Sequence, residues 1–336
     1  MIDNVMKLRK IQLELLKELK RVCDEHDLRW YACFGTLLGA VRYGGFLPWD
    51  DDVDIVMPVE DYRKLCMHKE WFSEGFFLQT PLDEGLTHIA KLRKDGTTAF
   101  RRNFVETLQA GGHLGIPIDI IPLADIPGSN CVNTPTLGWF KNEAVYLKEW
   151  FEPAGTVQFE GMELMAPAKP RKVLTEVYEA WDWPAGAQEP HPSFWFFDTE
   201  TDYSVYVKRF TGMLDGIEDK KLYMFGAADS LRIWLERFDR RDQVVCAFDN
   251  SPGKWGSKVY GVDVRNPADL PGMIDDNSRV IIVSLWHQEI GMQLERMGIK
   301  DYYVYIDDYY DEKIGNKVVR REDTLQGVDM IPRWDG

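Results

Sequence analysis

The sequence predicts an α/β protein built from two domains. Its 336 residues exceed one typical domain, and 45% apolar and 13% aromatic residues suffice for packed cores. From Lys220 onward, short apolar strands alternate with helical patterns, as in a small parallel sheet. Before that point, an amphipathic helix precedes strands that carry isolated acidic residues. We therefore expect an α+β domain followed by a parallel-sheet domain.

The first domain begins with a helix. Within residues 5–27, apolar residues recur at helical spacing on one face, namely at Leu8, Ile11, Leu15, Leu19 and Val22. A strand-like run over 28–34 leads through Gly35-Thr36 into a short helix, and residues 43–48 are typical of a turn. Residues 53–57 predict a strand, and Asp61 is expected to cap the next helix.

The rest of the first domain contains one more short apolar strand, over 115–122, which carries the single charge Asp119. Helical patterns cover 135–152 and 169–183. Residues 184–200 are rich in proline, glycine and aromatics, without a clear period. We therefore expect the first domain to end near residue 200, followed by a linker or helix.

The second domain shows a regular rhythm of strands and helices. Four strands are expected at 222–226, 244–250, 280–284 and 302–306, with helices at 229–239 and through Leu294. The expected organisation is a catalytic domain over 1–200, a linker or helix over 201–219, a Rossmann-like accessory domain over 220–311 and a tail over 312–336.

Composition excludes several classes of protein. The 40 basic and 55 acidic residues give a net charge of −15, which argues against nucleic-acid binding. The five scattered cysteines contain no C-x-x-C pair, so neither a disulfide framework nor a thiolate zinc site is expected. Neither a signal peptide nor a transmembrane stretch is recognisable. We expect a soluble cytoplasmic protein, with peripheral contact at the inner membrane face and the oligomeric state left open.

Paired carboxylates mark the candidate site. Asp52 and Asp54 are two residues apart on an expected strand, so their side chains should share a face, with Val53 turned into the core. Their mutual repulsion favours a cation between them, and hard oxygen ligands suit Mg²⁺ or Mn²⁺. Asp119 is a third candidate ligand, because an unpaired charge in an apolar strand is costly, and Asp50 is a further one.

A phosphate-binding turn precedes these acids. Gly35-Thr36 lies between a strand and a short helix, where backbone N–H groups are presented to a phosphate. Together with the acids it predicts a two-metal site for phosphoryl or nucleotidyl transfer. The acceptor proton would pass to a carboxylate such as Asp119 or Asp50.

Long motifs carry a resemblance to a known family. The run from Gly35 to Arg42, the run Phe46-Leu47-Pro48-Trp49-Asp50-Asp51-Asp52-Val53-Asp54-Ile55, and the run from Gly115 to Leu123 resemble the LicD family over roughly residues 5–185. That family is similar to the DNA-polymerase-beta-like nucleotidyltransferase superfamily. The resemblance implies transfer of phosphocholine or another phospho-alcohol from a CDP-activated donor to a cell-surface glycan or teichoic acid.

The resemblance also implies residue roles. Asp52 and Asp54 match the paired metal ligands, and Asp119 the third carboxylate. The turn at Gly35 and Thr36 matches the phosphate turn of the superfamily. The expected donor-binding residues are this turn together with Arg42, Lys91 and Arg93. Three aromatic residues would suit a choline head group: Tyr43, Trp49 and Trp139.

The expected reaction is Mg²⁺- or Mn²⁺-assisted transfer from CDP-choline or another CDP-alcohol to a glycan or lipid-linked saccharide, releasing CMP. Two alternatives stay open: a nucleotidyltransferase acting on a small phosphorylated or sugar acceptor, and a non-catalytic nucleotide-binding partner subunit. In the second domain, the turn at Gly226 lacks the later glycines of G-x-G-x-x-G, and Asp249 ends a strand where an acid can bind a ribose. Nucleotide binding there is left open.

Overall fold

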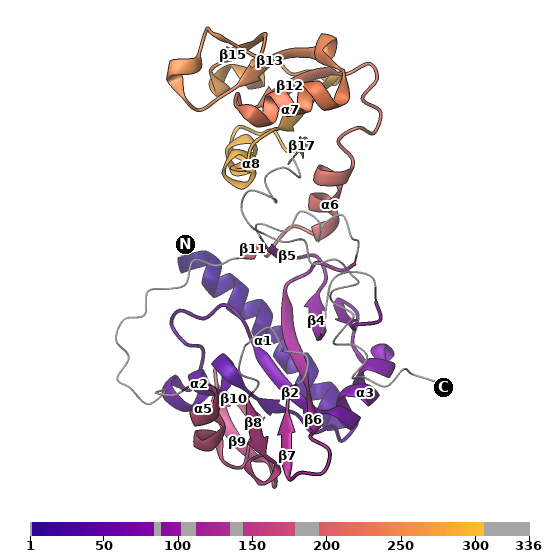
Figure 1. The fold of residues 1–336 in the computed structure, drawn as a ribbon, viewed down its shortest axis with the longest axis vertical. Coiled ribbons are helices and arrows are strands. Elements are labelled where there is room, and N and C mark those ends of the chain that lie inside the picture. Colours follow the sequence, from indigo (N-terminus) through magenta and orange to yellow (C-terminus); the bar gives the residue numbers. More distant parts are fainter. Residues whose placement is uncertain (1, 84–88, 102–111, 135–143, 179–194, 306–336) are drawn as a thin grey trace. The chain divides into compact units, whose positions relative to one another are not determined.

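The computed structural model describes residues 2–83, 89–101, 112–134, 144–178 and 195–305. The described residues form two compact units, one up to Tyr203 and one from Ser204 onward. Figure 1 shows helices and strands in both units. The mixture of helices and strands confirms the predicted α/β class.

A mixed sheet forms the frame of the first unit. Its order is β1 (Tyr31–Ala32), β2 (Asp54–Pro58), β6 (Pro117–Asp125), β4 (Ala90–Lys94) and β3 (Phe76–Gln79). Strands β2 and β6 run parallel, and the other neighbours in this order are antiparallel. Both faces of β2 are covered, because Ile55, Val56 and Met57 are fully buried, as is usual for a central parallel strand.

Three helices pack around this sheet: α1 (Ile2–Glu25), α2 (Phe34–Tyr43) and α3 (Val59–Met67). Helix α1 lies over β4 and β6, while α3 lies over β2 and β6 (Figure 1). The expected apolar face of α1 is buried at Leu8, Leu15, Leu19 and Val22, whereas Ile11 is only half-buried and Gln12 takes its place in the interior.

Shorter elements complete the first unit. They are η1 (Lys69–Trp71), β5 (Thr98–Arg101), β7 (Cys131–Asn133), β8 (Val145–Leu147), η3 (Lys148–Trp150), β9 (Gly155–Phe159), β10 (Met162–Ala166), α5 (Pro170–Val177) and β11 (Trp195–Asp198). Strands β9 and β10 form a hairpin, β11 pairs with β5, and β7 joins β6 to β8. Helix α5 packs on α2.

Several expected elements differ from the structure. The helix expected over 135–152 is wrong in its described part, because residues 145–147 pair with β7 and residues 148–150 form a 3₁₀ turn. Asp61 does not cap α3, which begins at Val59; its carboxylate accepts hydrogen bonds from Arg29 instead. The strand expected over 28–34 shortens to two residues.

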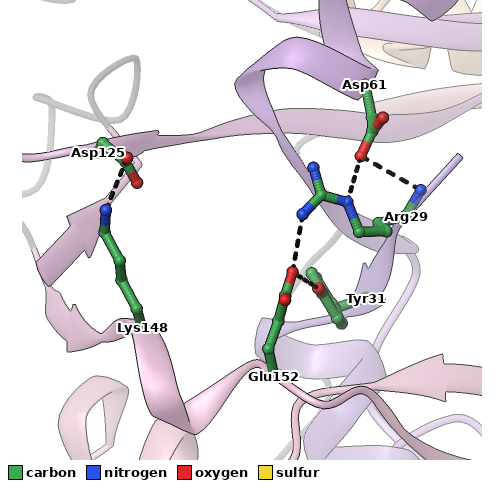
Figure 2. A network of polar contacts seen from close by, with 6 residues as sticks. All are labelled: Arg29, Tyr31, Asp61, Asp125, Lys148 and Glu152. Atoms are coloured by element: carbon green, nitrogen blue, oxygen red, sulfur yellow. Dashed lines mark hydrogen bonds and ion pairs between the residues drawn. The ribbon is translucent and has the colours of Figure 1, made fainter. Parts of the chain in front are cut away.

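A polar network supports the edge of the sheet beside β1 (Figure 2). Nε of Arg29 donates to Asp61 at 2.7 Å, and its Nη1 donates to Glu152 at 2.8 Å. The hydroxyl of Tyr31, in β1, donates to the same Glu152 oxygen at 3.4 Å. Arg29 thus joins α3 to the segment after η3. Nearby, Lys148 pairs with Asp125 at the end of β6 (Figure 2).

A six-stranded, mostly parallel sheet forms the second unit, in the order β14-β15-β13-β12-β16-β17. Its elements are α6 (Tyr203–Thr211), β12 (Lys221–Phe225), α7 (Asp229–Phe238), η4 (Arg241–Gln243), β13 (Val244–Phe248), η5 (Pro252–Lys254), β14 (Lys258–Val259), β15 (Val262–Arg265), η6 (Pro267–Gly272), β16 (Ser278–Ile282), α8 (His287–Arg296) and β17 (Tyr302–Val304). The four predicted strands are confirmed; β14 and β15 were not predicted.

The parallel strands lie in the order β15-β13-β12-β16-β17, which is the order of the first five strands of a Rossmann-type sheet. Buried residues from β12, β13 and β16 meet α7 in the core of this unit, including Met224, Ala247, Ile281, Leu231 and Trp234. Within the described ranges of both units, every helix is too short or too polar to cross a lipid bilayer.

Candidate functional site

Three charged residues lie side by side on neighbouring strands of the first unit. Asp54 begins β2, and its register partner on the parallel strand β6 is Asp119. On the other side of β6, Lys91 of β4 is the antiparallel partner of Asp119. Directly opposite residues point to the same face of a sheet, so the three side chains form one row, Asp54–Asp119–Lys91. The prediction placed Asp119 beside Asp54, and the structure brings them together.

The row contains one close ion pair. Nζ of Lys91 lies 2.5 Å from Oδ1 of Asp119, and the two side chains are 12% and 26% exposed. A half-buried pair of this kind is screened less by solvent than a surface pair. Lys91 also acts to lower the pKa of Asp54, whereas burial and the charges of Asp119 and Asp50 raise it. The ammonium therefore partly neutralises both strand carboxylates.

A second group of acids lies just before β2. Carboxylate oxygens of Asp50, Asp51 and Asp52 lie within 4.8 Å of one another, close enough to share one cation. We name residues 50–52 the acidic loop. Asp52 belongs to this loop and not to the strand as expected, because β2 begins only at Asp54; Val53 between them is fully buried, as predicted. These oxygens fit a hard divalent cation by their chemistry.

Burial and nearby like charges raise the pKa values of three of these acids. Burial, together with the charges of Asp119 and Asp50, raises the pKa of Asp54 to about 8. Asp52 is exposed as a residue, but partial withdrawal of its carboxyl from water and the charges of Asp54 and Asp50 raise its pKa above the usual range. Burial also raises the pKa of Asp50, although a hydrogen bond with Asp52 opposes this. Without a cation, the carboxyl of Asp54 therefore carries a proton near neutral pH, as expected for a site that gathers more acids than bases.

The Gly35–Thr36 turn supports the acids directly. A Cβ at Gly35 would lie 2.3 Å from Oδ2 of Asp50, so a larger residue there would push this carboxylate away from the helix N-terminus. The hydroxyl of Thr36 accepts a hydrogen bond of 2.9 Å from the backbone N–H of Asp54, and Thr36 is 3% exposed. In the structure, these residues contact the acids of the candidate site; their predicted contact with a phosphate stays a prediction.

Two residues of helix α1 that were not predicted from the sequence also contact this region. Nη2 of Arg9 donates to the backbone oxygens of Leu47, Pro48 and Asp50 at 2.6, 3.2 and 2.9 Å. Nε2 of Gln12, which is 1% exposed, donates to the backbone oxygen of Asp51 at 2.8 Å. The available signal was a polar residue in the buried stripe of α1. These bonds tie the acidic loop to a helix that lies far from it in sequence.

The predicted donor-binding cations have different environments. Lys91 lies among the acids, whereas Arg93 is 5% exposed and donates to Gln79 and to the backbone oxygen of Gly115. Burial lowers the pKa of Arg93 to about 10. Arg42, at the end of α2, has its guanidinium 5.6 Å from the ring centre of Tyr43. Of these cations, Lys91 has the strongest geometric connection with the acids.

Two of the three aromatic candidates lie together. The rings of Tyr43 and Trp49 meet edge to face, with centroids 6.4 Å apart, and Tyr43 is 45% exposed. Trp139 lies outside the described residues. A further aromatic, Tyr178 at the end of α5, was not predicted; burial and the nearby charges of Asp54 and Asp50 raise its pKa.

In the second unit, Asp249 is engaged within the protein. Its Oδ2 accepts hydrogen bonds from the N–H of Ala227 at 3.0 Å and from Lys254 at 2.8 Å, and its Oδ1 accepts one from the N–H of Ser251. Ala227 follows Gly226, the turn that would face a dinucleotide phosphate in a Rossmann-type fold. The described contacts of Asp249 are therefore those of a residue that holds this turn.

Sequence comparisons match part of the first unit to a known family. Residues 27–169 match the family described as LicD/FKTN/FKRP, nucleotidyltransferase domain. A 62-residue stretch is 36% identical to the lipopolysaccharide cholinephosphotransferase LicD of Haemophilus influenzae and covers 18% of this chain and 23% of that protein. A 48-residue stretch is 40% identical to an uncharacterized protein of Rickettsia prowazekii, covering 14% and 18% of the two chains. The matched stretches thus span less than a quarter of each relative.

Comparison with solved structures adds little. A crystal structure of ANT(2")-Ia in complex with adenylyl-2"-tobramycin aligns with a TM-score of 0.28 and 15% identity, over 52% of this chain and 82% of that one. A crystal structure of RSP in complex with beta-NAD+ and operator DNA aligns with a TM-score of 0.26 and 14% identity, over 49% and 80%. Similarity this low supports no functional inference. Residues 27–169 of this chain thus match the nucleotidyltransferase domain of the LicD/FKTN/FKRP family.

Proposed function

We propose that the first unit transfers phosphocholine, or a similar phospho-alcohol, from a CDP-activated donor to a hydroxyl of a glycan or lipid-linked saccharide. The observation that supports this most is the row Asp54–Asp119–Lys91 beside the acidic loop. A site with several carboxylates and one lysine suits a divalent cation and a diphosphate better than a neutral ligand. The match to a cholinephosphotransferase of Haemophilus influenzae supports the choice of group transferred.

The residues have separable tasks in this reaction. The acceptor oxygen forms a bond to the phosphorus that carries the alcohol, the bond from that phosphorus to the bridging oxygen breaks, and CMP leaves. A carboxylate of Asp50 or Asp119 takes the acceptor proton. Mg²⁺ or Mn²⁺, held by Asp52, Asp54 and Asp119 with Asp50 as a further ligand, would neutralise the diphosphate charge. Lys91 supplies a further positive charge for the phosphates.

The remaining predicted residues shape the donor site in this proposal. The edge-to-face pair Tyr43–Trp49 offers ring faces that attract a quaternary ammonium. Gly35 and Thr36 keep the N-terminus of α2 against the acids. Because a hydroxyl that accepts from Asp54 can still donate its own O–H, Thr36 would bind a phosphate through this O–H and through the backbone N–H groups of the turn.

Product analysis tests the reaction. Incubation with Mg²⁺, a CDP-alcohol and a saccharide acceptor should release CMP and attach the phospho-alcohol to the acceptor, as followed by ³¹P NMR. The family description favours one alternative, nucleotidyl transfer to a small acceptor. That reaction would instead consume a nucleoside triphosphate and release diphosphate, so the two products distinguish the two activities.

A further inference from the structure

The ion pair of Lys91 creates a conflict within the proposed site. Asp119 is one of the proposed metal ligands, yet its Oδ1 already has the ammonium of Lys91 at 2.5 Å. Both side chains are largely withdrawn from solvent, at 12% and 26% exposure. A divalent cation on Asp119 would bring two positive charges close together where water screens them weakly. Lys91 and a metal ion therefore compete for the same carboxylate.

Lys91 balances negative charge within the row. The row Asp54–Asp119–Lys91 places a positive charge at the end of two neighbouring carboxylates, which would otherwise repel each other uncompensated. Arg93 lies two residues along the same strand but is committed to Gln79 and Gly115, so it cannot take this part without breaking buried hydrogen bonds. Lysine, with a flexible stem and a compact charge, changes partners easily.

We propose that Lys91 is a built-in counter-ion that a divalent cation displaces from Asp119, which frees its ammonium for the donor phosphates. This proposal rests on the proposed metal site and deepens it. Before the metal binds, Lys91 stabilises the acids and is not available to a diphosphate. After the metal binds, the ammonium loses its carboxylate and the diphosphate is the anion that replaces it. Metal binding thus precedes productive donor binding.

A charge-removal experiment tests the competition. The Mn²⁺ dissociation constant is measured by electron paramagnetic resonance, without donor, for Lys91→Met and for the control Lys94→Met. Lys94 lies on the same strand, 3.9 Å from Glu14, so the control removes an equal charge away from the acids. Lys91→Met should bind Mn²⁺ at least about fivefold tighter than Lys94→Met, because a competing cation is gone. Equal or weaker binding would overturn the proposal.

The second half of the proposal concerns the donor. With Mn²⁺ saturating, Lys91→Met should bind CDP-choline at least about tenfold more weakly than Lys94→Met by calorimetry, because a charge-assisted contact is lost. Tighter Mn²⁺ binding with unchanged donor affinity would overturn the transfer of Lys91 to the phosphates. The Mn²⁺ measurement contains no donor, so its result does not depend on CDP-alcohol transfer. Displacement of Lys91 and the proposed reaction can therefore fail separately.

A labelling measurement covers the case in which Lys91→Met does not fold. Reductive methylation of the unmutated protein, read by mass spectrometry, reports how accessible each lysine is. Adding Mn²⁺ should raise methylation of Lys91 and leave Lys94 unchanged, because only Lys91 loses its carboxylate. Unchanged or reduced methylation of Lys91 in Mn²⁺ would show that it stays on Asp119 and would contradict the displacement.

Discussion

Asp54 is the residue whose ionisation depends most clearly on the fold. Burial and the neighbouring acids raise its pKa from 3.8 to about 8 in the folded protein. Between these values the folded protein binds a proton that the unfolded chain releases, so stability must fall as pH rises. A cation bound at the site would lower the pKa of Asp54 again, because a positive charge favours the charged carboxylate.

We expect the melting temperature of the metal-free protein to fall between pH 5 and pH 8, within the window set by the raised pKa of Asp54. Thermal unfolding at a series of pH values measures this. Asp54→Asn should flatten the profile, because asparagine does not titrate, and Mg²⁺ should reduce the slope in the unmutated protein. An equally steep fall in Asp54→Asn would rule out Asp54 as the source.

Asp54→Asn should also reduce turnover by roughly 10³-fold, because the site loses a charge that would hold the metal against the diphosphate. Steady-state kinetics with a CDP-alcohol measures this. Asp24→Asn is a matched control, since Asp24 is an exposed carboxylate of α1 paired with Lys20. Near-normal turnover by a folded Asp54→Asn protein would remove Asp54 from the site.

Among the elements, α1 has an unexpected part in the site. The whole of α1 lies before residue 27, where the family match starts, yet Arg9 and Gln12 bind backbone oxygens of the acidic loop. Backbone oxygens offer no charge of their own, so these bonds set the position of the loop and leave its carboxylates open to a ligand. Arg9 also lies 4.9 Å from the centre of the Phe46 ring, which fixes its own place.

Arg9→Ala should weaken Mg²⁺ binding by about tenfold, because the acidic loop and the segment before it lose three hydrogen bonds and must be ordered on binding. Calorimetry measures this affinity below the melting temperature of the variant. Arg9→Lys should restore part of it, and Lys10→Ala, an exposed neighbour on α1, should leave it unchanged. A lower melting temperature with normal Mg²⁺ affinity would mean that Arg9 only stabilises the fold.

Helices and strands could be predicted from the sequence where the spacing of apolar residues reflects which face is buried. The sequence predicted α1, β2, β6 and the four strands of the second unit, since apolar spacing reflects the face that packs. It also placed Asp119 beside Asp54, because one charge in an apolar strand needs a neighbour. It failed where pairing overrides propensity: residues 145–147 are a strand because β7 supplies hydrogen bonds.

Contacts between residues far apart in the chain could not be predicted from the sequence. Arg9 and Asp50 are 41 positions apart, and no sequence pattern indicates that a guanidinium will donate to a backbone oxygen at that distance along the chain. The pairing of Lys91 with Asp119 likewise depends on the register of β4 against β6. The prediction named both residues, as donor ligand and metal ligand, but only the register shows that they meet.

The whole molecule consists of two units with separate cores. We expect Mg²⁺ to stabilise the first unit alone, because all proposed ligands lie there. Differential scanning calorimetry of the full chain should show one transition that shifts upward with Mg²⁺ and one that does not. Leu231→Ala, which opens a cavity in the second core, should lower only the transition that ignores Mg²⁺.

A shift of both transitions with Mg²⁺, in the protein with Leu231→Ala as well as without it, would contradict the assignment of the site to one unit. The same calorimetric scan also tests whether the second unit binds a dinucleotide. Since Asp249 holds the turn at Ala227, we expect dinucleotides to leave both transitions in place.

The central claim is that the carboxylates around Asp54 form a metal-dependent site for a CDP-activated phospho-alcohol. The most direct measurement is a donor screen by thermal shift, with CDP-choline, CDP-glycerol, CDP-ribitol and nucleoside triphosphates, each with and without Mg²⁺. We expect a CDP-alcohol to raise the melting temperature only with Mg²⁺, and Asp54→Asn to abolish the effect. No shift with any CDP-alcohol, or an equal shift without Mg²⁺ or in Asp54→Asn, would contradict it.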